Sequence, residues 1–280
     1  MKPFCDLHAH SVFSDGTYTP AQLLEEAERL GLGALALTDH NTVAGLPDFL
    51  AAAKGKRVEA VPGVELSVDY LGIELHMLAL FVEPKHFPAI TEMLREGVRA
   101  KEESNIKLAK ALRDAGYPID YSALRDATPN GQINRAHIAA ELTRLGYTPD
   151  IQTAFKTLLS PKDGLYEPPK RPDAFETISF IRSMGAVSVL AHPFLDLKEE
   201  SAVRTFLETA APRGLSGMEV YHPKHDLQQR QIAMALVEEF ALKPSGGSDF
   251  HGRNKPDIRL GAGRGDLQIP MSFFRDLKEG

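Results

Sequence analysis

The chain has 280 residues, of which 43% are hydrophobic and 25% are charged, and its formal net charge is −6 at pH 7. This composition is typical of a globular protein, and the length suits one large α/β domain with an insertion. This negative charge disfavours wholesale binding of nucleic acid through a basic surface, so we do not expect stable binding of duplex nucleic acid.

Cysteine content and hydropathy indicate the cellular compartment in which the protein is expected. Cys5 is the only cysteine, which excludes disulfides within the chain. No apolar run approaches the ~20 residues that a membrane span needs, and no signal peptide is visible at the N-terminus. We therefore expect a cytoplasmic protein that makes no contact with a membrane.

Strands and helices alternate in the first part of the sequence. Short apolar runs of the kind found in covered sheets predict strands at residues 4–7, 34–38, 58–64 and 73–82. A capping box formed by Thr19 and Gln22 begins a helix that Gly31 ends. A second helix is expected around residues 47–54, between the second and third strands.

The alternation then breaks and later resumes. An apolar stripe at helical spacing predicts one long helix, and two shorter helices are expected after it, at residues 88–115, 135–145 and 150–159. We interpret residues 85–165 as a helical insertion into a domain made of residues 1–84 and 166–280. Further strands are predicted at 186–191, 217–221 and 243–247, with helices at 173–184 and 226–242.

Polar residues with metal-binding side chains follow these strands. His8 and His10 lie two residues apart, so their side chains share one face of the chain as it leaves the first strand. Imidazole and carboxylate groups recur at or just past later strand ends, and the candidates are His8, His10, Asp15, His40, Glu65, His76, His192, Asp249 and His251. A barrel of seven strands fits better than an open sheet, because it gathers these ends into one site.

Nine nitrogen and oxygen ligands are more than one metal ion takes. We therefore expect two or three divalent ions, with Glu65 as a bridge between them. Mn2+ is the expected metal, and Zn2+ or Fe2+ are alternatives that the same ligand types accept. Asp6, Asp39 and Glu219 are expected to orient ligand imidazoles without binding metal themselves.

Six short motifs occur in an order that resembles the PHP family, which is named for bacterial DNA polymerases and histidinol phosphatase. They are Asp6-x-His8-x-His10, Ser14-Asp15-Gly16, Thr38-Asp39-His40, Pro62-Gly63-Val64-Glu65, Ala191-His192-Pro193 and Gly247-Ser248-Asp249-Phe250-His251-Gly252. The resemblance implies a distorted (β/α)7 barrel. It also implies three ligand sets: His8, His10, Glu65 and Asp249; Glu65, His76 and His192; and Asp15, His40 and His251.

The helical insertion is similar to that of stand-alone PHP members that act as 3′,5′-nucleoside bisphosphate phosphatases, whose relatives trim short RNA from the 5′ end. The resemblance implies that Arg135 and His137, which follow Asn134 at a helix start, grip a phosphate. Lys101 stands where the family tends to carry an arginine. His225 matches a histidine that the family places near the substrate.

These observations predict a metal-dependent phosphatase that removes the 3′-phosphate of a nucleoside 3′,5′-bisphosphate and possesses some 5′-3′ trimming activity on short oligonucleotides. His192 and His225 are the predicted catalytic residues, with His222 as a further candidate proton donor. Two alternatives stay open. One is a histidinol phosphatase or other small-molecule phosphatase, and the other is a metal-binding PHP module without catalytic activity.

Overall fold

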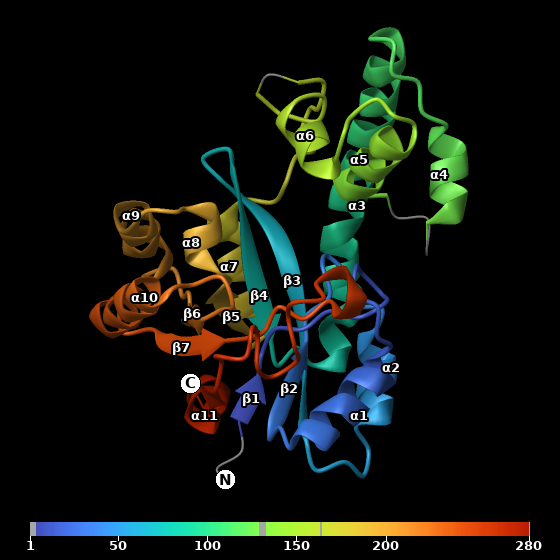
Figure 1. The fold of residues 1–280 in the computed structure, drawn as a ribbon. Coiled ribbons are helices and arrows are strands. Elements are labelled where there is room, and N and C mark those ends of the chain that lie inside the picture. The colour runs from blue at the N-terminus through green and yellow to red at the C-terminus, as the bar shows by residue number, and fades with distance from the viewer. Residues whose placement is uncertain (1–3, 129–132, 163, 280) are drawn as a thin grey trace. The chain divides into compact units, whose positions relative to one another are not determined.

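The computed structural model describes residues 4–128, 133–162 and 164–279. It divides into two compact units, the first made of Met1–Glu92 with Pro172–Gly280 and the second of Met93–Arg171 (Figure 1). The second unit begins and ends a few residues later than the predicted insertion. Within the described ranges, no helix is both long enough and apolar enough to cross a membrane.

The first unit is built around one sheet of eight strands in the order β7-β6-β5-β4-β3-β2-β1-β8. The strands are β1 (Phe4–Asp6), β2 (Ala34–Leu37), β3 (Glu59–Tyr70), β4 (Ile73–Leu80), β5 (Val187–Leu190), β6 (Gly217–Tyr221), β7 (Lys243–Gly246) and β8 (Ile269–Pro270). β1 to β3 pair in parallel, as do β5 to β7, whereas β4 runs antiparallel to both neighbours. β8 pairs antiparallel with β1.

The two ends of this sheet meet and nearly close a barrel. The backbone N–H of Leu7, just after β1, donates to Gly246 O in β7 at 3.1 Å, and Asp249 N–H donates to His8 O at 2.9 Å. Side chains of β1, β2, β4 and β5 form a buried cluster with Phe273 and Leu277 of α11 (Met271–Glu279). The N- and C-terminal parts of the chain therefore lie side by side next to the predicted metal ligands His8 and Asp249.

The predicted α/β barrel is confirmed, with one more strand than expected. All seven predicted strands are present, and β8 is the addition. β3 was expected to end at Glu65 but continues to Tyr70, because Gly63 to Tyr70 pair residue by residue with β4. Glu65 therefore lies inside a strand and not at its end.

Helices cover the outside of the barrel (Figure 1). Besides α11 they are α1 (Pro20–Leu30), α2 (Leu46–Ala52), α7 (Ala174–Ser183), α8 (Pro193–Asp196), α9 (Glu200–Ala210) and α10 (Leu227–Glu239), with 3-10 turns η1 (Pro84–His86) and η3 (Gly252–Asn254). The predicted capping box of α1 is present, with Thr19 and Gln22 exchanging side-chain and backbone hydrogen bonds. Gly31 ends this helix with a φ of 72°, a conformation that glycine adopts without strain.

The second unit contains helices joined by loops, and no strand occurs among its described residues. α3 (Phe87–Asp114) begins in the first unit and continues into the second, which also contains α4 (Tyr121–Ala127), α5 (Arg135–Arg144) and α6 (Ile151–Lys156). Apolar side chains such as Leu108, Leu112, Ile138 and Leu142 form its core. This unit thus has a hydrophobic cluster of its own, as a folded domain requires.

Two buried carboxylates hold the loops at the barrel's ligand-bearing end. Asp6 accepts hydrogen bonds from Ser248 N at 2.8 Å, Ser248 Oγ at 2.6 Å and Gly261 N at 2.7 Å. Asp39 accepts from Ser11 N at 2.7 Å and from the hydroxyls of Ser11 and Ser14 at 2.6 and 2.7 Å. Both were expected to orient imidazole rings, and this expectation is wrong: they fix the backbone that carries the histidines.

We expect Asp6→Ala to lower the free energy of unfolding of the metal-free protein by about 3–5 kcal/mol, because several buried donors lose their shared acceptor. Urea unfolding followed by circular dichroism measures this loss. Asp276→Ala, on the exposed surface of α11, serves as control and should stay within about 0.5 kcal/mol of the parent. A small effect of Asp6→Ala would show that Asp6 does not fasten these loops.

Candidate metal centre

The carboxylate of Glu65 lies at the centre of a cluster of imidazoles. Its side chain is fully buried in β3. Oε2 faces His40 Nδ1 at 2.9 Å and the Nε2 atoms of His8 and His10 at 3.2 Å each. Oε1 faces His76 Nδ1 at 2.8 Å and His192 Nε2 at 3.0 Å. One carboxylate is therefore surrounded by ring nitrogens from five histidines.

The ring nitrogens are also close to one another. His8 Nε2 and His10 Nε2 are only 3.1 Å apart, and both are near Asp249 Oδ1, at 3.8 and 3.4 Å. His251 Nε2 lies 3.1 Å from Asp15 Oδ1 on the other side of His10. Nitrogen and oxygen atoms that converge in this way suit a shared cation, which replaces the protons that would otherwise separate them.

The described residues contain four overlapping groups whose ligand atoms all lie within 4.8 Å of one another. They are His10, Asp15, His40 and His251; His8, His10 and Asp249; His8, Glu65 and His192; and His40, Glu65 and His76. Together these groups include all nine residues that the sequence proposes as metal ligands. The first group contains the predicted set of Asp15, His40 and His251 and adds His10, and the second contains the predicted set of His8, His10 and Asp249 without Glu65. His76 and His192, predicted to share an ion, fall in different groups.

Several buried polar atoms of this cluster lack a hydrogen-bond partner among the described residues. They are the Nδ1 atoms of His10, His76 and His192 and the Oε2 atom of Glu65. Buried polar atoms are rarely left without a partner in native proteins. These four atoms are placed to contact metal ions rather than to hydrogen-bond with one another, so the residues present fit a metal centre.

Further charged groups touch the outer atoms of these ligands. Glu219 Oε1 lies 2.9 Å from His8 Nδ1, as expected for a carboxylate that orients an imidazole. The sequence did not identify Asp196, whose Oδ2 is 3.3 Å from His192 Nδ1, or Lys255, whose Nζ is 2.6 Å from Asp249 Oδ2. The four-residue spacing of His192 and Asp196 is the one signal in the sequence that could have revealed Asp196.

The PHP domain family matches residues 6–150 of this chain. The chain belongs to the PHP family. A 5′-3′ exoribonuclease of Haemophilus influenzae is 32% identical over 246 residues, which cover 88% of this chain and 89% of that protein. A 3′,5′-nucleoside bisphosphate phosphatase of Chromobacterium violaceum is 30% identical over 248 residues, which cover 88% of this chain and 86% of that protein.

Two further similarities extend the range of PHP relatives. A phosphoribosyl 1,2-cyclic phosphate 1,2-diphosphodiesterase of Eggerthella lenta is 31% identical over 255 residues, or 89% of this chain and 94% of that protein. A crystal structure from Bifidobacterium adolescentis, described as a metal-dependent phosphoesterase, superposes with a TM-score of 0.82 at 29% identity, covering 98% of this chain and 95% of the other. This PHP protein is accordingly a metal-dependent phosphoric ester hydrolase.

The electrostatics of the PHP site favour anionic carboxylates. Burial raises the pKa of Glu65, but the surrounding histidines, His40 foremost, hold it well below its usual range. Burial lowers the pKa of His10, yet its close contacts with the carboxylates of Asp249 and Glu65 raise it to about 9. Burial and the nearby charge of His10 lower the pKa of His251 to about 4. Without metal, His10 is therefore protonated at neutral pH, whereas His251 is neutral.

A second pair of histidines lies beside the cluster. His222 Nε2 is 3.4 Å from Asp249 Oδ2, and its Nδ1 accepts from Lys224 N at 3.2 Å. His225 donates from Nδ1 to Val220 O at 3.1 Å, while its buried Nε2 has no hydrogen-bond partner in the described part of the chain. Burial, followed by the charge of His222, lowers the pKa of His225 to about 4.

The predicted phosphate-binding residues belong to the second unit. Asn134 caps α5, and its backbone N–H donates to His137 Nδ1 at 3.2 Å. The guanidinium of Arg135 lies over the rings of Tyr166 and Phe155, at 4.3 and 5.5 Å from their centroids. Lys101 is exposed on α3. The role of these four residues in substrate binding remains a prediction.

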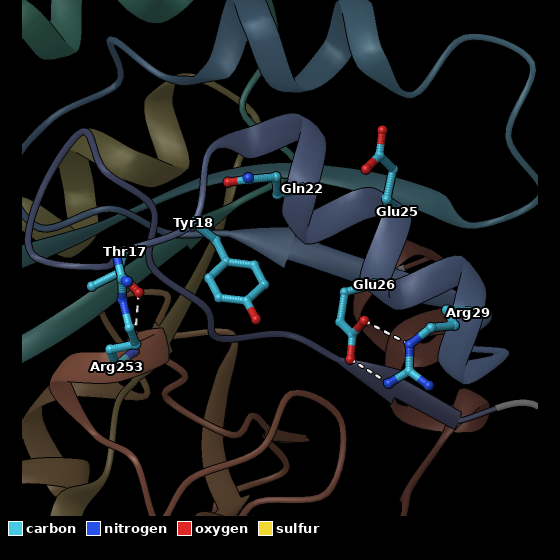
Figure 2. A pocket seen from close by; sticks show the side chains of 7 residues that line it. All are labelled: Thr17, Tyr18, Gln22, Glu25, Glu26, Arg29 and Arg253. Carbon is cyan, nitrogen blue, oxygen red and sulfur yellow. Dashed lines mark hydrogen bonds and ion pairs between the residues drawn. The ribbon is translucent and has the colours of Figure 1, made fainter.

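A surface groove of about 540 Å³ lies along α1, and residues that follow Asp15 and His251 in the chain also line it (Figure 2). It is lined by Thr17, Tyr18, Gln22, Glu25, Glu26, Arg29 and Arg253. Arg253 N–H donates to Thr17 Oγ1 at 3.0 Å, and Arg29 is paired with Glu26. None of the nine ligand candidates lines this groove, so it is separate from the metal centre.

We expect the affinity for Mn2+ to rise from about pH 7 to about pH 9. His10 holds a proton with a raised pKa of about 9, and an incoming ion must displace it. Each proton displaced contributes up to about a tenfold gain in affinity per pH unit, until the pH passes that pKa. Titrations of metal-free protein with Mn2+ across this range measure the slope. A flat profile would show that His10 is neutral before the metal binds.

Proposed function

We propose that this enzyme hydrolyses the phosphate ester of a small nucleotide, removing the 3′-phosphate of a nucleoside 3′,5′-bisphosphate. The cluster around Glu65 carries the proposal, because it offers enough ligands for two or three ions at one point. Two of the relatives named above act on nucleotide phosphoesters or RNA according to their names. Trimming of short oligonucleotides from the 5′ end would use the same site.

Nine residues would hold the ions in this proposal, with Glu65 shared between two of them. When bound, divalent ions supply a water molecule that is a nucleophile near neutral pH, and positive charge opposite the phosphate oxygens. Mn2+ is the proposed metal, and Zn2+ or Fe2+ suit the same donors. Because the pKa values of Asp15, Glu65 and Asp249 are lowered, these side chains are anionic ligands at neutral pH.

The charge of such a centre suits a phosphate monoester. Three dications and three carboxylates leave a net positive charge, in a chain whose formal net charge is −6. A phosphate monoester carries roughly −1.5 to −2 near pH 7. The loaded centre would thus attract the substrate locally, although the chain as a whole is acidic.

We assign His225 the role of a proton or hydrogen-bond acceptor beside the reacting phosphate. Its Nδ1 is the protonated nitrogen, since it donates to Val220 O, so Nε2 presents a lone pair. A pKa of about 4 keeps this ring neutral near pH 7 and makes it a poor proton donor. His192 is the other proposed catalytic residue. It would act as a metal ligand, because its Nε2 lies next to Glu65 Oε1.

The N-terminus of α5 is the proposed site of the second phosphate. His137 Nδ1 accepts from Asn134 N, which leaves Nε2 as the nitrogen that carries the proton in the neutral ring. Arg135 is restrained by its contact with Tyr166 and so loses less freedom when it binds an anion. Both residues lie in the first turn of α5, whose dipole also favours a negative charge.

A phosphodiesterase that opens a phosphoribosyl cyclic phosphate is the second candidate. The similarity to the Eggerthella lenta enzyme, which spans 94% of that protein, favours it specifically. A phosphoribosyl cyclic phosphate carries a phosphate monoester on its ribosyl group besides the cyclic diester, so a phosphate anchor at α5 would serve this substrate as well. Phosphate release from a 3′,5′-bisphosphate, measured against ring opening of a cyclic phosphate, separates the two candidates.

We expect His225→Asn to reduce kcat by about a hundredfold or more, the usual range for a lost acid–base group. The asparagine amide can replace Nδ1 as donor to Val220 O, so the change removes Nε2 selectively. Metal affinity should not change. His86→Ala, at a residue outside the metal cluster, is the control. Normal kcat in His225→Asn would remove this residue from the mechanism.

We expect Arg135→Ala and His137→Ala to lower kcat/KM for a nucleoside 3′,5′-bisphosphate by about ten- to a hundredfold, because each removes a charge-assisted contact worth ~1.5–3 kcal/mol. Hydrolysis of an aryl phosphate should barely change, since this substrate has no second phosphate. Phosphate release from both substrates, with histidinol phosphate as a third, measures the selectivity.

Arg144→Ala is the matched control, because Arg144 lies at the other end of α5 in an ion pair with Glu141. It should leave both reactions unchanged. An equal loss on the bisphosphate and the aryl phosphate would mean that Arg135 and His137 bind the reacting phosphate instead. No loss on either substrate would argue against phosphate binding by α5.

A further inference from the structure

Glu219 is a buried carboxylate that belongs to none of the four ligand groups. It lies in β6, and each of its oxygens has a different partner. Oε1 is 2.9 Å from His8 Nδ1, and Oε2 accepts from the backbone N–H of His192 at 2.7 Å. One side chain thus contacts the ring of one ligand candidate and the backbone of another, although these two are far apart in sequence.

The contact with His8 selects which ring nitrogen faces the cluster. Because Glu219 accepts from Nδ1–H, the Nε2 atom of His8 is left to face Glu65, His10 and Asp249. An imidazole binds a metal through a lone pair, and a carboxylate on its other nitrogen fixes both tautomer and ring orientation.

The contact with His192 restrains an unusual backbone. His192 has φ 25° and ψ 56°, in a region that residues with a side chain seldom adopt and that costs of order 1–3 kcal/mol. The residue follows β5 and begins α8, so its φ determines where the imidazole points. Its Nε2 lies 3.0 Å from Glu65 Oε1 in this conformation. The hydrogen bond that the His192 backbone N–H donates to Glu219 Oε2 helps to hold that position.

We propose that Glu219 is a positioning residue that shapes one part of the metal centre, the ligand group of His8, Glu65 and His192. This rests on the metal centre proposed above. In the described part of the chain Glu219 makes no hydrogen bond to Asp15, His40 or His251, which lie together in another group. Its removal therefore affects the ligand groups that contain His8 or His192 and spares the group of His10, Asp15, His40 and His251.

Both carboxylate oxygens are needed for this role. In Glu219→Gln, the amide nitrogen faces one of two N–H donors, so either the His8 contact or the His192 contact is lost. Glu219→Asp keeps the charge but is one methylene shorter, and it cannot span both partners without movement. The two variants disrupt the simultaneous contacts with His8 and His192 in different ways, so one variant remains informative if the other does not fold.

The test is a titration of metal-free protein with Co2+, followed by visible absorption and by the number of ions bound at equilibrium. Asp15→Asn marks the class of sites that contains Asp15, His40 and His251. We expect Glu219→Gln and Glu219→Asp to lower the Co2+ affinity of a different class of sites by about ten- to a hundredfold. The double variant Glu219→Gln/Asp15→Asn should lose affinity at both classes. Glu208→Gln, exposed on α9, is the matched control and should bind as the parent does.

The outcomes separate this inference from the metal centre itself. If the parent protein binds at most one ion, the proposed centre fails. If the parent binds two or three ions and both Glu219 variants bind them with unchanged affinity, the positioning role alone fails. It also fails if the variants weaken every class equally while the Tm of the metal-free protein falls, because Glu219 would then serve stability only.

Discussion

The buried carboxylate of Glu65 is the group on which the arrangement of this site depends. A charge without solvent contact is tolerated in a protein only when opposite charges or metal ions surround it. Here the partners are five imidazoles, and they come from segments that run from the first strand to the loop after the fifth. The barrel must close for these rings to meet around one carboxylate.

The reversed strand β4 is part of that requirement. His76 pairs with Ser67 across the β3–β4 hairpin, and Ser67 lies two residues from Glu65, on the same face of β3. This antiparallel register brings an imidazole from inside one strand next to a carboxylate inside its neighbour. A regular barrel of parallel strands would offer ligands only from its strand ends. The departure from regular alternation therefore adds a candidate ligand to the cluster around Glu65.

Much of the barrel and its ligands could be predicted from the sequence, because both follow local patterns. Short apolar runs located seven strands, and the side chains that follow them are of metal-binding types. The helices α4, α8, α9 and α11 and the short strand β8 were not predicted. β8 has only two residues and is a strand solely because it pairs with β1, which is a contact that no local pattern reveals.

The supporting residues of the site were harder to recognise. Asp6 and Asp39 stand next to histidines in sequence, yet their partners are backbone N–H groups and serine hydroxyls. Lys255 reaches Asp249 through a turn, with no periodicity to indicate it. Glu219 contacts His8 through tertiary geometry, whereas Asp196 lies four residues from His192 in the chain. Hydrogen bonds to the backbone depend on where loops lie, so the identity of a residue does not disclose them.

The buried carboxylate of Glu65 is proposed to join at least two metal ions. Anomalous diffraction from a crystal of the Mn2+-loaded protein tests it most directly. The account predicts two or three anomalous peaks among the nine ligand residues, with Glu65 Oε1 and Oε2 on different ions. A single peak, or peaks that Glu65 does not touch, would contradict it.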